Sequence, residues 1–89
     1  MPQLLSGEVF IVNSERSSSV TFGLGDDGTK WTLYSLGPSE GRAFPYHKFF
    51  GIRRGDSQKV YLLEQDHRYR IFFDREAQVW DLREIRIQE

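Results

Sequence analysis

Short apolar segments recur along the chain and are separated by turn-forming residues. In the segment 20–24, Val20, Phe22 and Leu24 alternate with polar or small residues, which is the period of a strand with one buried face. The segment 8–12 is apolar on both faces, which is typical of a central strand covered on both sides. Strands separated by turns at roughly eight to twelve residues indicate an all-β sandwich or barrel.

Turn residues set the limits of the expected strands. The run 25–28, Gly-Asp-Asp-Gly, predicts a tight hairpin turn, because these residues tolerate positive φ. The run 37–41 is a second break, and Pro45 limits the next strand to an edge or a bulge. Residues 83–89 suit a helix or a strand. The expected strands are 8–12, 20–24, 29–36, 42–46, 47–54, 58–63, 68–73 and 79–82.

These segments predict one domain over residues 1–89, since 89 residues are too few for two domains. No connection is long enough for a helical crossover, so the strands should pair mainly antiparallel. We therefore expect a single antiparallel β-sandwich of seven or eight short strands. A small closed β-barrel is the alternative.

Composition excludes several classes of site. The chain has no cysteine, which removes disulfides and thiolate metal ligands. The first residues have neither a basic region nor a long apolar stretch, so we expect no signal peptide. The longest apolar runs are too short to cross a bilayer, so we expect a soluble chain without a membrane span. The net charge is −1, yet residues 42–75 hold eight basic and four acidic residues.

Two runs within this basic segment, 47–54 and 67–73, interleave cations with aromatic rings. Proteins that bind single-stranded nucleic acid use such surfaces, in which cations contact phosphates and rings stack on bases. The same rings are also what a core requires, and cations on strands suppress edge-to-edge association. The cations that would bind are Lys48, Arg53, Arg68 and Arg70, the last two on one strand face.

Other motifs predict little chemistry. Arg54 begins an Arg-Gly-Asp tripeptide that matches an adhesion motif, although Gly-Asp is also ordinary turn chemistry. The run 26–28 lacks the spaced oxygen ligands of a calcium loop, and the spacing of His47 and His67 does not suggest zinc. No Gly-x-Ser-x-Gly elbow is present. We therefore expect no metal, no cofactor and no enzymatic activity.

The two tryptophans have different expected places. Trp31 follows the hairpin turn near the start of a strand, where partial exposure would let its ring stack on a sugar. Trp80 alternates in register with Leu82 and is expected in the core.

The strand-and-turn pattern over about two thirds of the chain carries a family resemblance. Its segments are 9–14, 20–22, 27–28, 36–42, 50–53 and 69–71. They resemble the prealbumin-like β-sandwich family in its von Hippel-Lindau β-domain form, and also small bacterial β domains. The resemblance implies a sandwich and a peptide-binding role, but the hydroxyproline-binding residues of that family have no counterparts that can be placed here.

The function expected is that of a non-catalytic interaction module. It would recognise a protein or glycan partner through loops around Asp26, Ser39 and Arg54 or through an edge strand. The alternative is a β-barrel that binds single-stranded nucleic acid. The candidate binding residues are Lys48, Arg53, Arg54, Arg68, Arg70 and Trp31.

Overall fold

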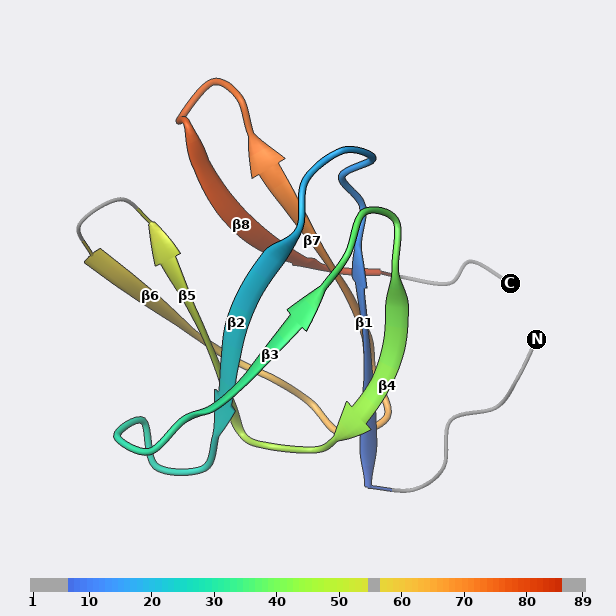
Figure 1. The fold of residues 1–89 in the computed structure, drawn as a ribbon. Coiled ribbons are helices and arrows are strands. Elements are labelled where there is room, and N and C mark those ends of the chain that lie inside the picture. The colour runs from blue at the N-terminus through green and yellow to red at the C-terminus, as the bar shows by residue number, and fades with distance from the viewer. Residues whose placement is uncertain (1–6, 55–56, 86–89) are drawn as a thin grey trace.

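The computed structural model describes residues 7–54 and 57–85, which form eight strands in two four-stranded sheets (Figure 1). The strands are β1 (Glu8–Asn13), β2 (Val20–Gly25), β3 (Thr32–Leu36), β4 (Gly41–Pro45), β5 (Phe49–Arg54), β6 (Ser57–Leu62), β7 (Arg68–Asp74) and β8 (Val79–Glu84). The predicted all-β sandwich is confirmed. The described residues form no helix, and thus none that would cross a membrane.

Sheet A has the strand order β4-β1-β7-β8, and sheet B has the order β3-β2-β5-β6. Each sheet keeps two edge strands, so the alternative of a closed barrel is wrong. Pairing is antiparallel except between β1 and β7, which run parallel with Phe10 beside Arg68 and Asn13 beside Ile71. The strand 8–12, expected to be central and covered on both sides, lies inside sheet A between β4 and β7. Only its inner face is covered, since Phe10 and Val12 are half-buried on the outer face of the sheet.

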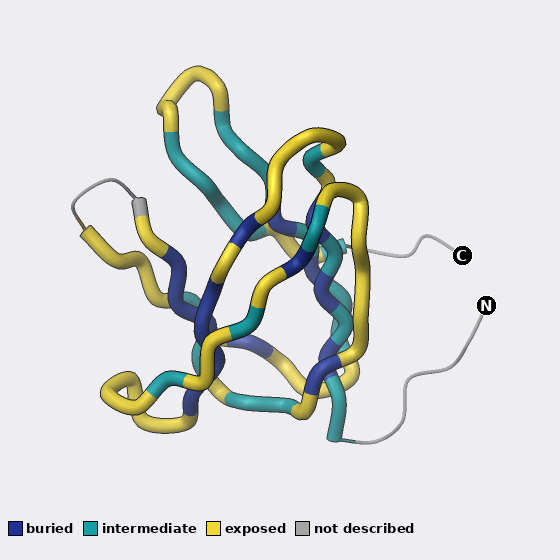
Figure 2. The backbone as a smooth tube through the Cα atoms, in the orientation of Figure 1, coloured by how far each residue is buried: buried dark blue, intermediate teal, exposed yellow. Residues whose placement is uncertain are grey.

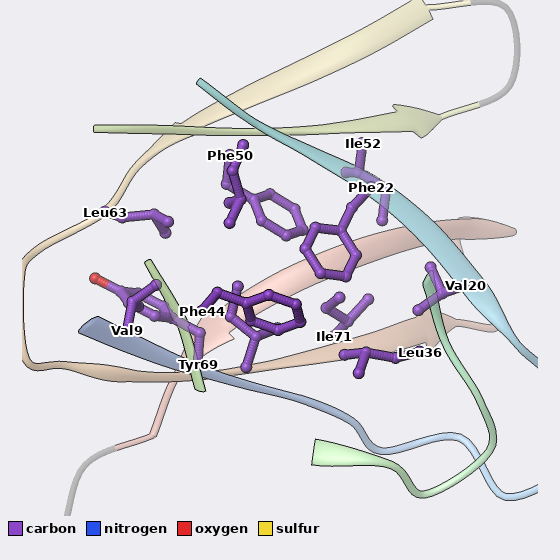
Figure 3. Packing of buried hydrophobic residues seen from close by; sticks show 12 residues of the cluster. Val9, Val20, Phe22, Leu36, Phe44, Phe50, Ile52, Leu63, Tyr69 and Ile71 are labelled. Carbon is purple, nitrogen blue, oxygen red and sulfur yellow. The ribbon is translucent and has the colours of Figure 1, made fainter. Parts of the chain in front are cut away.

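The core lies between the two sheets and is rich in aromatic side chains (Figures 2 and 3). Phe22 is buried at its centre, with ring centroids 5.1 Å from Phe50 and 5.5 Å from Phe44. Ile71 contributes from sheet A and is fully buried. Trp80, expected in the core, is half-buried and packs against the edge of the cluster.

Asn13 is the one buried polar side chain in the described part of the chain, and its amide joins three segments. Its Nδ2 donates to the carbonyl oxygens of Ser18 at 2.7 Å and Gly37 at 3.1 Å. Its Oδ1 accepts a hydrogen bond from the backbone N–H of Glu15 at 3.0 Å. The end of β1 in sheet A is thereby fixed to the loops that flank β2 and β3 in sheet B.

Some strand limits differ from those expected. The third strand begins at Thr32, because Asp27 Oδ1 accepts the N–H groups of Thr29 and Lys30 and holds those residues in the preceding loop. Gly28 has φ +77°, as the predicted turn requires. β5 begins at Phe49 instead of residue 47, and β8 continues to residue 84, so this part of the ambiguous tail is strand.

Candidate functional site

The outer face of sheet B carries exposed apolar side chains. Leu33 on β3 is 69% exposed, and Leu62 and Val60 on β6 are 66% and 45% exposed. Leu36 and Tyr61 on the same strands point into the core. Because successive side chains of a strand point to opposite faces, the three exposed residues point to solvent. We call this surface, together with Trp31, the apolar face.

Trp31 lies on a shelf of glycines at the centre of the apolar face. Gly23 and Gly51 are paired across β2 and β5. A Cβ atom on Gly23 would lie 3.2 Å from Trp31 Cε3, and one on Gly51 would lie 3.0 Å from Trp31 Cη2. The six-membered ring of the indole therefore lies close against the backbone. Trp31 is half-buried, in line with the partial exposure expected from its place near the start of a strand.

A cavity of about 450 Å³ opens beside this shelf. β2 and β5 pair only between residues 23–25 and 49–51, and the cavity is lined by the unpaired continuations of both strands. Apolar walls come from Trp31, Leu33 and Trp80, whereas Thr21, Arg53 and Gln58 supply polar groups. The volume lies in the range of small-ligand and side-chain pockets.

The outer face of sheet A has a different character. Phe10 on β1 and Phe72 on β7 lie on it together with Arg68, Arg70 and Arg83, as the register of the sheet requires. The Arg68 guanidinium carbon lies 5.7 Å from the Phe10 ring centroid. Those of Arg70 and Arg83 lie 5.1 and 5.5 Å from the centroid of Phe72. We call this surface the arginine–phenylalanine face.

The four cations expected to bind nucleic acid are divided between these two sheets. Arg68 and Arg70 share one face, as expected, whereas Arg53 lines the cavity of sheet B. Lys48 precedes β5, with its Nζ 5.5 Å from the Phe49 ring centroid. The side chain of Arg54 lies outside the described part of the chain, as do residues 55–56.

Sequence reasoning missed three members of the arginine–phenylalanine face, namely Phe10, Phe72 and Arg83. Period-two alternation along 68–72 places Phe72 on the same side as the two arginines, so the position of Phe72 could have been predicted from the sequence. Phe10 and Arg83 required knowledge of which strands flank β7.

The histidines and several acidic groups serve the fold. His67 Nε2 lies 3.2 Å from Glu64, and its Nδ1 lies 3.1 Å from Glu84. These three residues are near enough to share a cation, but the two carboxylates engage opposite nitrogens of the ring and form a network of polar contacts with it. It joins the end of β8 to the loop before β7.

The pKa values of Glu15 and Tyr69 are shifted by their contacts in the fold. The backbone N–H of Phe73 donates to Glu15 and, with Arg75, holds the pKa of Glu15 below its ordinary value of 4.5. Burial raises the pKa of Tyr69, whose hydroxyl oxygen accepts the N–H of Glu64 at 2.9 Å. Both groups hold chain segments together, and neither lies on the two faces described above.

Comparison of the chain with protein-family models, curated proteins and solved structures finds no match. The resemblance to the prealbumin-like sandwich therefore stays a prediction. Function has to be argued from the two sheet faces.

Proposed function

We propose that this chain is a non-catalytic interaction module that binds a protein partner on the apolar face of sheet B. The observation that carries the proposal is the position of the exposed large apolar residues of the described chain. Leu33, Val60 and Leu62 all lie on this one face, beside Trp31 and a cavity. Contiguous exposed apolar surface marks interaction sites, because its burial releases about 25 cal/mol per Å².

The chemistry of the face favours a protein over a glycan. Branched aliphatic side chains suit the apolar centre of a protein interface, and tryptophan is frequent among its energetically dominant residues. The cavity beside Trp31 has room for an apolar side chain of the partner, while Arg53 and Gln58 at its border offer hydrogen-bond donors. A pyranose requires a denser set of polar groups around the stacking ring.

The proposal moves the binding surface from loops to a sheet face. Asp26 accepts hydrogen bonds from His47 and the backbone of Lys48, and the Ser39 N–H donates to the Glu15 carbonyl. These loops are therefore tied to their own chain. Edge-strand recognition remains part of the proposal, since β6 is an edge strand and carries Val60.

The test compares two double variants in capture from an extract of the source cells. Leu33→Ser with Leu62→Ser should abolish capture of a specific protein while leaving the melting temperature nearly unchanged, because both side chains are already exposed. Arg16→Ser with Ala43→Ser is the matched control, since both residues are exposed outside the apolar face. Equal capture by all three proteins would contradict the proposal.

Two further measurements identify the class of partner. Sedimentation at several concentrations detects a second copy of the chain, whose association the leucine variants should also abolish. Binding to a glycan array that is lost in Trp31→Ala and kept in the leucine variants would replace the protein partner by a sugar.

A further inference from the structure

Two arginines that form no ion pair with the residues that the structure describes lie side by side on the outer face of sheet A. Arg70 on β7 and Arg83 on β8 are direct cross-strand neighbours. Neither forms an ion pair with a carboxylate in the ranges 7–54 and 57–85. Because like charges directly opposite each other destabilise a sheet, the pair is a site where a bound anion would lower the free energy.

The arginines are combined with aromatic rings on the two central strands. Arg70 and Arg83 both lie over Phe72, and Arg68 lies over Phe10. Phe10 in turn lies against Gly41, where a Cβ atom would come within 2.8 Å of its Cζ. Planar rings and planar guanidinium groups are thus held on the same open surface.

We propose that the arginine–phenylalanine face binds single-stranded nucleic acid. Phosphate groups would contact Arg70 and Arg83, and bases would stack on Phe10, Phe72 and the guanidinium planes. Four positions of β7 separate Arg68 from Phe72, or about 13 Å, so the face spans more than one nucleotide. A duplex keeps its bases stacked within the helix and offers this surface only phosphates.

The charges on the face are arranged to receive an anion at its middle. The carboxylates that share the face by register are Glu8 at the start of β1, Asp74 at the end of β7 and Asp81 on the edge strand β8. Asp81 accepts a hydrogen bond from the Tyr61 hydroxyl of sheet B, which draws its charge toward the rim. Asp74 accepts the N–H groups of Glu76 and Ala77 in the turn after β7, so the three carboxylates lie at the ends and the edge of the sheet, and Arg70 lies between them on a central strand.

The test is a fluorescence anisotropy titration of the intact chain with a labelled oligothymidylate at several salt concentrations. Arg70→Gln with Arg83→Gln should weaken binding at least about tenfold and reduce the salt slope by about two, one for each lost phosphate contact. Phe72→Leu should weaken binding about tenfold with the salt slope unchanged, because a stacking contact carries no charge.

The matched control is Lys30→Gln with Lys48→Gln, which removes the same charge from two exposed lysines that lie outside the arginine–phenylalanine face and outside the cavity of sheet B. Unchanged affinity in this control, together with the losses above, supports the proposal. No saturable binding by the parent chain, equal losses in both double variants, or equal affinity for the duplex would overturn it. The melting temperature of the arginine variant should not fall, because the substitution removes a repulsion. The test is independent of the proposed protein partner, since none of the variants changes a residue of the apolar face or of its cavity.

Discussion

Replacement of Asn13 by alanine should remove a large part of the stability of the fold. The substitution deletes the side-chain bonds to Ser18, Gly37 and Glu15, at 2.7, 3.1 and 3.0 Å. Each is worth about 0.5–1.5 kcal/mol net, and a buried carbonyl left without a donor costs about 1–3 kcal/mol. A loss of about 3 kcal/mol follows, which is a large fraction of the roughly 5–10 kcal/mol expected for a small domain.

Urea unfolding followed by tryptophan fluorescence measures this loss. With a slope of about 1.5 kcal/mol per M, the midpoint should fall by about 2 M at unchanged slope. Ser17→Ala is the control, because Ser17 is exposed in the same turn and its change should stay within about 0.5 kcal/mol. A midpoint for Asn13→Ala that falls no further than that of the control would refute the reasoning.

Asn13→Asp adds a test with a defined sign. The new carboxyl keeps an acceptor oxygen but loses the donor, and burial beside the three carbonyl oxygens of Ser18, Leu36 and Gly37 raises its pKa in the folded state. The variant should therefore be most stable below about pH 4, where the protonated acid donates as the amide did, and should lose that stability as the pH rises. A stability difference from the parent that does not depend on pH would contradict this account.

Three further outcomes follow from the core, a turn and an ion pair. Phe22→Ala should cost about 3–5 kcal/mol through cavity formation, and a parental melting curve would show that its face is not inward. Gly28→Val should cost about 1–2 kcal/mol from its φ of +77° alone, because no atom lies within 4 Å of the new Cβ; an unchanged curve would contradict the strain. The pKa of Glu15 is lowered by Phe73 and Arg75, so Glu15 stabilises the fold above pH 4.5 and progressively less as the pH falls through its folded pKa. In melting temperatures measured over a pH series, Glu15→Gln should therefore reduce the decrease at acid pH.

The strands and the core were predictable because they depend on local period. The alternation of Val20, Phe22 and Leu24 required no knowledge of a partner strand. The parallel pairing of β1 with β7 had no such local signal, since it depends on how the two sheets divide the strands.

The candidate surfaces were less predictable for the same reason. The two basic-aromatic runs look equivalent along the chain, but β5 and β7 belong to different sheets. Asn13 looks like an ordinary turn residue, and Gly23 and Gly51 look like spacers. Only the assembled sandwich makes Asn13 a buried link and the two glycines a shelf for Trp31.

The parallel β1–β7 pair also determines an order of assembly during synthesis. Phe10 on β1 pairs with Arg68 on β7, which lies far along the chain. The strand β1 therefore leaves the ribosome long before β7 has been synthesised. Until then one hydrogen-bonding edge of an apolar strand is open to other nascent chains. The strands of sheet B all lie within residues 20–62, so its last strand is synthesised before β7. We expect sheet B to form first and to act as the surface on which sheet A closes, at the slow rate typical of distant strand pairings.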